Sequence, residues 1–141
     1  MHYTLKRITD EHPEWLDALK KRCYTVNGCC HIVHKDLGPF LNEYMYQDAL
    51  KILFDEQRIE YQKEYYFEIT YHGQRIAHKH YVDFLVNNEI ILECKAVEKL
   101  SAEHRQQVWN YMRLTGKSIG ILYNFGPISS QSEHYYLDKN G

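Results

Sequence analysis

Apolar positions along the chain follow two different spacings, which predict helices in some segments and strands in others. Helical spacing marks three segments, at about residues 13–35, 39–57 and 101–116. Alternating or continuous apolar runs mark strands at about residues 60–71, 74–86, 89–97, 117–125 and 134–137. The order α-α-β-β-β-α-β-β predicts an α/β fold with a mixed sheet flanked by helices, in one domain over residues 1–141.

The predicted helices carry signals at their ends and one weak point. Asn27-Gly28 is a weak point inside the first helix, where a kink or break could occur, and Gly38-Pro39 ends that helix. Ser101 occupies an N-cap position before the third helix, with His104 where a capping box usually has Glu or Gln. We therefore expect an imperfect capping box at this helix start.

An antiparallel hairpin is predicted around Asn87-Asn88, which separates two apolar runs. Asn tolerates the positive φ angles of tight turns. Successive side chains of a strand leave opposite faces, so Glu93 and Lys95 share one face while Cys94 points away. The hairpin then brings Asp83 alongside Glu93 and Lys95.

Three charges on so apolar a hairpin require an explanation, because an unpaired buried charge is costly. A Mg²⁺ ion held by Asp83 and Glu93, with the main-chain carbonyl of Cys94 as a third oxygen ligand, would supply one. Lys95 would then orient or deprotonate the attacking water, or stabilise charge on phosphoryl oxygens. The alternative is an ordinary ion pair between Lys95 and one carboxylate at a sheet edge.

Two helix faces could complete a site around these charges. Gln107 and Tyr111 lie one turn apart on the third helix, directly after the charged strand. Glu43 lies on the second helix, with Tyr46 and Gln47 a turn later. Each face taken alone is more often solvated, but together with the hairpin they form a constellation.

Composition and charge limit the classes of function. The net charge of −2 in 141 residues gives no electrostatic support for nucleic-acid binding, although a metal or a local basic patch could still engage phosphates. No apolar stretch approaches about 20 residues, so no membrane span is expected. The polar N-terminal residues do not resemble a secretory signal, and a cytoplasmic location is expected.

The four cysteines do not form a disulfide framework, because Cys29 and Cys30 are adjacent and the expected compartment is reducing. Cys23, Cys30 and His34 could share a helix face and bind zinc with a fourth ligand. The favoured interpretation is that these cysteines are small buried residues on a packed helix.

The constellation resembles the GxxExxR protein family, a compact branch of the PD-(D/E)XK nuclease superfamily with the RecB-like Gln-x-x-x-Tyr signature. The resemblance covers about residues 30–126. Its matching blocks are residues 33–39, 43–50, 83–86, 91–100, 107–111, 115–117 and 124–126. Phe40 replaces the Gly of the family name and Tyr46 replaces the Arg, and neither change removes a proposed metal ligand.

The resemblance implies a restriction-endonuclease-like core and metal-dependent hydrolysis of phosphodiester bonds in DNA. Asp83 and Glu93 would hold Mg²⁺ or Mn²⁺, and Lys95 would position the water. Glu43 would contact the metal through water or adjust a second ion. A homodimer is one arrangement that so small a nuclease could use.

Further roles implied by the resemblance concern the third helix and an upstream histidine. Gln107 and Tyr111 would contact the nucleic acid or brace Lys95. His34 is a weaker candidate metal ligand, because a histidine at a helix end is usually a cap. His78 and His80 with Lys79 could form a phosphate-facing patch, although a solvated strand edge is the commoner case.

Two other functions share these residues. One is a catalytically silent nuclease-fold module that binds or regulates a partner protein, which the net acidity and the short chain favour. The other is a metal-dependent hydrolase of a small phosphorylated molecule.

Overall fold

The computed structural model describes residues 4–9, 11–76 and 80–138. Its helices are α1 (Asp17–Leu37), α2 (Glu43–Glu56) and α3 (Ala102–Thr115), with a 3₁₀ turn, η1 (Glu14–Leu16), before α1. The larger sheet has the spatial order β1 (Thr4–Arg7), β8 (Gln131–Asp138), β7 (Ile119–Asn124), β6 (Ile90–Lys95), β5 (His80–Val86) and β2 (Tyr61–Phe67). A separate hairpin contains β3 (Thr70–Tyr71) and β4 (Gln74–Arg75). Across these ranges, no helix has both the length and the apolar character needed to cross a membrane.

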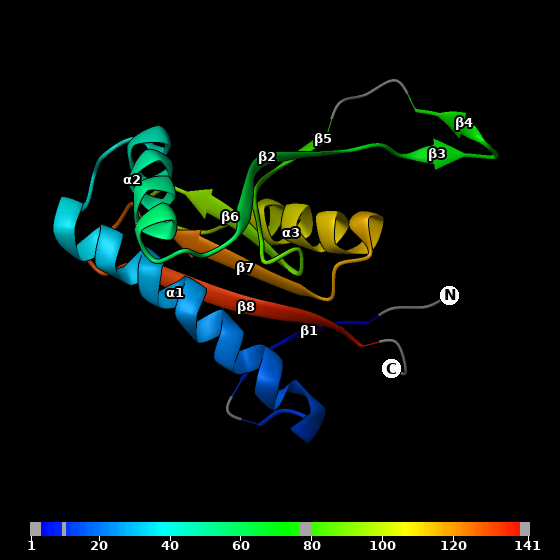
Figure 1. Ribbon diagram of the computed structural model, residues 1–141, viewed down its shortest axis with the longest axis horizontal. Helices are drawn as coiled ribbons and strands as arrows, with labels where there is room; N and C mark the ends of the chain where they lie inside the picture. The colour runs from blue at the N-terminus through cyan, green and yellow to red at the C-terminus, as the bar shows by residue number, and fades with distance from the viewer. Residues whose placement is uncertain (1–3, 10, 77–79, 139–141) are drawn as a thin grey trace.

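The larger sheet is mixed, as predicted. β6 and β7 are parallel and are joined through α3, whereas the other neighbouring strands are antiparallel. Helices α1 and α2 cover one face and α3 covers the other (Figure 1). This arrangement confirms the predicted fold class, a restriction-endonuclease-like α/β sheet flanked by helices.

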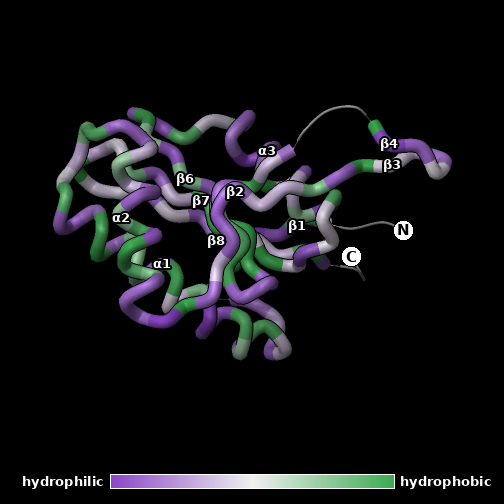
Figure 2. The backbone as a smooth tube through the Cα atoms, turned by 45° about the horizontal axis from the view of Figure 1, so that its top comes forward, coloured by the Kyte–Doolittle hydropathy of each residue, from purple (hydrophilic) through white to green (hydrophobic). Residues whose placement is uncertain are grey.

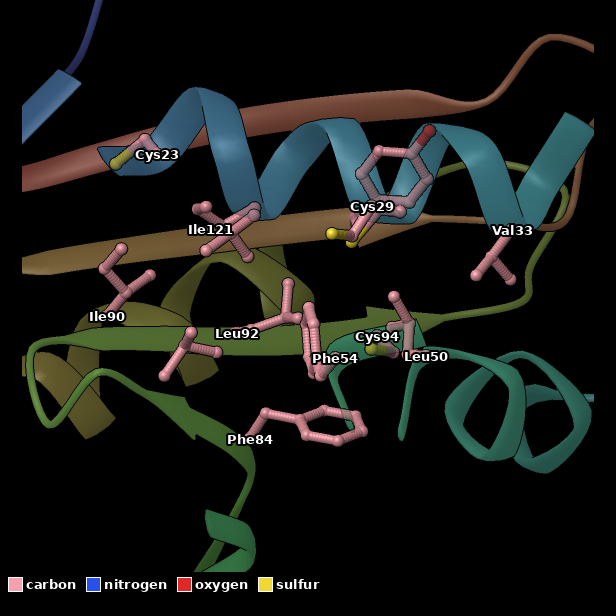
Figure 3. Close-up of a cluster of buried hydrophobic side chains, with 14 of the residues drawn as sticks. Cys23, Cys29, Val33, Leu50, Phe54, Phe84, Ile90, Leu92, Cys94 and Ile121 are labelled. Atoms are coloured by element: carbon pink, nitrogen blue, oxygen red, sulfur yellow. The ribbon is translucent and has the colours of Figure 1, made fainter. Parts of the chain in front are cut away.

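Two hydrophobic layers hold the helices on the sheet. On one face Leu92 and Cys94 of β6 share a buried cluster with Val33 of α1 and Leu50 of α2 (Figure 3). On the other face Ile91 and Leu122 pack with the apolar side chains of α3. Because side chains alternate along β6, Glu93 and Lys95 lie on the α3 side with Ile91.

A glycine sets the distance between α3 and the sheet. A Cβ atom added at Gly120 of β7 would lie 2.5 Å from the Sδ atom of Met112 and 2.8 Å from Cγ1 of Val108. Real side chains do not tolerate such approaches, so only glycine lets α3 pack this closely. The close packing also holds the polar residues of α3 near β6.

Strand β1 was missed by the sequence pattern. It pairs antiparallel with β8, with Leu5 opposite Leu137, and makes the outer edge of the sheet. Its four residues include only one apolar side chain, so no alternation was readable, and its pairing with a distant segment decides the structure. Its partner β8 covers Gln131–Asp138, longer than the predicted 134–137.

The helix has no break at Asn27-Gly28, because α1 runs continuously from Asp17 to Leu37. Cys23, Val26, Cys30 and Val33 of this helix are buried in one layer of the core. Their burial outweighs the modest cost of a glycine in the middle of a helix.

The sequence predicts two strands between α2 and the Asn87-Asn88 turn, at residues 60–71 and 74–86. In the structure the first is divided into β2 and β3, and the second into β4 and β5. β2 pairs directly with β5, while β3 and β4 form their own hairpin, which projects from the body in both views (Figures 1 and 2). Among the described residues of these segments, β2 and β5 contribute to the helix-covered layers, whereas the residues of β3 and β4 are exposed. Burial against the helices therefore selects which part joins the larger sheet.

The tight turn between β5 and β6 is confirmed. Asn87 and Asn88 have φ angles of 53° and 56°, and the Glu89 N–H donates to the Val86 carbonyl at 3.1 Å. Both φ values lie in the left-handed region that asparagine tolerates better than most residues.

The capping box of α3 is complete although it contains a histidine. The His104 N–H donates to Ser101 Oγ at 3.3 Å, and the Ser101 N–H donates to His104 Nδ1 at 3.0 Å. Nδ1 accepts a hydrogen bond only when it carries no proton. Burial and the charge of Lys95 lower the pKa of His104 from its ordinary 6.5.

We expect His104→Gln to reduce the acid sensitivity of the fold. Because the folded-state pKa of His104 is lowered, the unfolded chain takes up this proton more readily. The free energy of unfolding of the wild type should therefore fall as the pH drops below about 6.5. Glutamine keeps the acceptor but does not titrate, so urea titrations at pH 7 and pH 5 should give a smaller difference for the variant. Ser101→Ala is the control and should cost about 1 kcal/mol at both pH values.

Candidate active site

The site begins where the hydrogen-bonded ladder between β5 and β6 stops. The paired positions end at Phe84 opposite Leu92. Beyond this pair, the backbone N–H groups of Asp83 and Cys94 donate to side-chain carboxylates and not to backbone carbonyls. The Asp83 N–H donates to Glu93 Oε1 at 3.1 Å, and the Cys94 N–H donates to Asp83 Oδ2 at 2.8 Å. The two carboxylates therefore hold together the strand ends that the ladder no longer joins.

The partner ladder between β2 and β5 is interrupted at the same level. Lys63 pairs with Phe84 and Tyr65 with Val82, whereas Glu64 is unpaired opposite Asp83 and has a φ of 55°. Val82 packs in the α3-side layer and Phe84 in the opposite layer, although they are two residues apart. The regular alternation of faces is thus broken at Asp83, although the register of the two strands is the same on either side of Glu64.

The backbone of Cys94 faces this opening, while its thiol does not. The N–H of Phe125, which directly follows β7, donates to the Lys95 carbonyl at 2.8 Å. Successive residues of a strand direct their backbone groups to opposite edges, so the Cys94 N–H and C=O face the β5 side. The thiol is packed in the α1–α2 layer, and burial raises its pKa well above 9.0. Only the carbonyl of Cys94 is therefore available as a metal ligand.

The carboxyl pair is held in a state that resists ionisation. Burial raises the pKa of Glu93 well above its ordinary 4.5, and the charge of Asp83 raises it further. Burial also raises the pKa of Asp83, although hydrogen bonds from the Cys94 N–H and with Glu93 oppose this. Repulsion between the two carboxylates thus adds to burial in raising the pKa of Glu93, and burial is the larger cause.

Lys95 is held by a chain of hydrogen bonds from α3. Its Nζ donates to Gln107 Oε1 at 2.9 Å, and Gln107 Nε2 donates to Tyr111 Oη at 3.2 Å. The positive charge of Lys95 lowers the pKa of both Asp83 and Glu93. The structure thus brings together the predicted residues of β6 and α3, with Tyr111 bracing Gln107.

Glu43 approaches from the first turn of α2. It is half-buried, burial raises its pKa, and the charge of Asp83 raises it further. Gln47, itself buried, donates from Nε2 to Glu43 Oε1 at 3.0 Å. A third carboxyl group therefore lies within electrostatic reach of Asp83 and Lys95, on a different element.

Lys63 of β2 was missed by sequence reasoning. Its Nζ lies 3.8 Å from Asp48 Oδ1 and 3.8 Å from Glu64 Oε1, and its charge lowers the pKa of Asp83. The alternation of Tyr61, Lys63 and Tyr65 could have placed the lysine on a half-buried face. Its position beside Asp83 depends on the register of β2 on β5, which local pattern does not give.

The two predicted histidines that the structure describes, His34 and His80, have partners other than the carboxyl pair. His34 Nε2 is hydrogen-bonded to the Pro127 carbonyl at 2.9 Å, and His34 is not among the groups that shift the pKa of Asp83 or Glu93. Its role as a metal ligand stays a prediction. His80 stacks on Phe67, while His78 and Lys79 lie outside the described residues.

Comparison with known proteins identifies the class of this site. Residues 20–135 match the model of the PD-(D/E)XK nuclease superfamily, and the chain belongs to this superfamily. No curated protein matches the sequence significantly. Among solved structures, the crystal structure of SSO0001 is similar, with a TM-score of 0.48 and 18% identity over 84% of this chain. The match covers 62% of the SSO0001 chain.

The donor atoms at the opening suit a hard divalent cation. Carboxylate oxygens of Asp83 and Glu93 face the same edge as the Cys94 carbonyl, and Mg²⁺ and Mn²⁺ prefer such oxygen ligands. Within residues 4–9, 11–76 and 80–138, no group of three or more His, Cys, Asp or Glu side chains is placed to hold a metal. A cation here would therefore need the backbone carbonyl, water or substrate to complete its ligands.

We expect Glu93→Gln to stabilise the metal-free protein near neutral pH. The unfolded chain releases this proton near pH 4.5, whereas the folded chain retains it to a higher pH. The free energy of unfolding of the wild type in EDTA should therefore fall as the pH rises above about 4.5. Glutamine still accepts from the Asp83 N–H but does not titrate, so urea titrations from pH 4.5 to 8 should give a shallower decline.

The control for this prediction is Glu60→Gln, at an exposed position outside the site. It should keep the wild-type dependence on pH. Equal slopes for Glu93→Gln and the wild type would contradict the assignment of a retained proton to this pair.

Proposed function

We propose that this chain is a metal-dependent nuclease that hydrolyses phosphodiester bonds in DNA. The observation that carries the proposal is the opening in the sheet, where a buried carboxyl pair, a backbone carbonyl and a braced lysine meet. Asp83, Glu93 and the Cys94 carbonyl hold Mg²⁺ or Mn²⁺. When bound, such an ion polarises a phosphoryl oxygen and lowers the pKa of a bound water.

The side chains around the carboxyl pair have separate roles in this proposal. Lys95 orients the attacking water and stabilises negative charge on the phosphoryl oxygens. Gln107 is a positioning residue, because its amide oxygen fixes Lys95 Nζ, and Tyr111 in turn fixes Gln107. Glu43 acts from the edge of the site through water or a second ion, and His34 remains a weaker candidate.

We also propose that the chain belongs to the GxxExxR branch with the RecB-like Gln-x-x-x-Tyr signature. The hydrogen bond between Gln107 and Tyr111 supports a joint role for the two signature residues. Phe40, in the place of the family glycine, has a φ of 68°, a conformation that glycine adopts most readily. A cytoplasmic location is in keeping with four buried cysteines, none of which forms a disulfide. A homodimer is the assembly that we propose for so small a nuclease.

Lys95→Ala should abolish cleavage without unfolding the protein. Purified wild type should cut DNA when Mg²⁺ or Mn²⁺ is added, and the variant should be slower by about 100-fold or more. Gel assays of cleavage and a melting curve measure the two effects. Lys99→Ala, which removes an exposed lysine of the following loop, is the matched control and should retain activity.

The alternative is a nuclease-fold module that binds a partner protein without turnover, favoured by the net charge of −2. Calorimetric titration with Mn²⁺ separates the two functions. A nuclease should bind the ion and lose this binding in the Asp83→Asn variant.

Undiminished cleavage by Lys95→Ala would overturn the assignment of the lysine.

A further inference from the structure

A groove of about 700 Å³ opens beside the candidate active site. Its walls include Phe40 and Leu41 before α2, Ala96 and Val97 after β6, and Ile128 after β7. Both β6 and β7 end toward α2 (Figure 1). Ala96 directly follows Lys95, so the groove begins one residue from the proposed catalytic lysine. Crevices at the carboxyl ends of parallel strands are a common place for ligands.

Phe40 is held in a strained and exposed position at this groove. Its φ of 68° is unusual for a bulky side chain, yet 76% of the residue is exposed, so burial does not offset the strain. The surrounding hydrogen bonds impose the conformation. Tyr46 Oη donates to the Gly38 carbonyl at 2.7 Å and accepts from the Leu41 N–H at 3.1 Å, while the Phe40 N–H donates to the Gly126 carbonyl at 3.1 Å.

The floor of the groove is fixed before any ligand binds. The buried Asn124 amide accepts from the Val97 N–H at 3.0 Å and donates to the Val97 carbonyl at 2.9 Å. A Cβ atom at Gly126 would lie 2.3 Å from that carbonyl oxygen, so the two loops are in direct backbone contact. Above this floor Ile128 is 76% exposed, like Phe40. The groove is thus a slot with a hydrogen-bonded floor and two exposed apolar side chains in its lining.

The charge of the residues that line the groove indicates which kind of ligand it can bind. Among the described residues that line the groove, Glu98 is the one with a charged side chain, and none is basic. A phosphate group would therefore have no basic partner here, whereas the apolar face of a base needs none. The net charge of −2 also gives no electrostatic support for a binding mode that neutralises many phosphates. Stacking of bases on aromatic rings is the contact that supplies affinity without basic residues.

We propose that Phe40 and Ile128 clamp an unpaired DNA base next to the phosphate that lies at Lys95. This inference rests on the proposed nuclease function, because a strand that places a phosphate at Lys95 brings an adjoining nucleotide to Ala96 and the groove. The ring of Phe40 stacks on the base, and the hydrogen-bonded floor sets its depth. A base enters such a slot only when it is not paired, so the groove selects single-stranded or frayed DNA.

The test compares Phe40→Gly with Phe40→Tyr. Glycine adopts the positive φ without strain, so Phe40→Gly should melt at the wild-type temperature or above it. The same change should weaken binding of a fluorescent single-stranded oligonucleotide roughly 5- to 150-fold, the usual worth of one stacked base. Phe40→Tyr keeps the ring and should stay within about twofold of the wild type.

Binding is measured in EDTA and in an Asp83→Asn, Glu93→Gln background. These amides keep the acceptors for the Asp83 and Cys94 N–H groups and remove the charges that face the phosphate. Neither metal nor cleavage then affects the result. A second measurement uses the same background protein with Phe40 unchanged and an oligonucleotide without bases, which should bind more weakly than the intact strand.

The outcomes separate this inference from the proposed function. If the wild type cleaves DNA but Phe40→Gly binds the oligonucleotide as tightly as the protein that keeps Phe40, the proposed base slot is wrong and the nuclease proposal stands. Binding that depends on Phe40, without cleavage by the wild type in Mg²⁺ or Mn²⁺, would overturn the nuclease proposal alone. Equal binding of intact and base-free strands would overturn the slot, as would self-association in sedimentation that Phe40→Gly removes.

Discussion

The site depends on two hydrogen bonds in which a backbone N–H donates to a side-chain carboxylate, of Asp83 or Glu93, and not to a backbone carbonyl of the neighbouring strand. A sheet normally pairs its buried N–H groups with backbone carbonyls, and leaving them unpaired is costly. Here the Asp83 and Cys94 N–H groups bind side-chain oxygens instead. The strands separate without orphaned donors, and the Cys94 carbonyl is presented at the opening. The residues that could hold a metal are therefore also those that keep the sheet intact.

The position of β6 in the sheet gives this opening a rigid frame. β6 lies between β5 and β7 and is covered by helices on both faces. Its alternation directs Leu92 and Cys94 into one core layer, and Glu93 and Lys95 toward α3. The parallel crossover returns α3 over the same strand, so that Gln107 reaches Lys95 Nζ. A change in the packing of α3 on Gly120 would move this amide and the lysine together.

Burial makes the ionised form of the carboxyl groups at this site unfavourable. The pKa values of Glu93, Asp83 and Glu43 are all raised, with desolvation as the largest cause. A fold selected for stability alone would not concentrate three such carboxyl groups, and departures of this kind are typical of functional sites. The strained φ of Phe40, beside the groove that follows Lys95, is a second departure at the same end of the sheet.

The sequence by itself determined the helices, the Asn87-Asn88 turn and the faces of Glu93 and Lys95, because these depend on local spacing and turn chemistry. It also indicated Gln107 and Tyr111, which are one helical turn apart. Tertiary structure alone decided the β1–β8 pairing, the position of Lys63 beside Asp83 and the unbroken course of α1. These features depend on strand register and on burial against distant segments. The opening at Asp83 is also decided by tertiary structure, because it requires β5 to lose its pairing with both β2 and β6 at this residue.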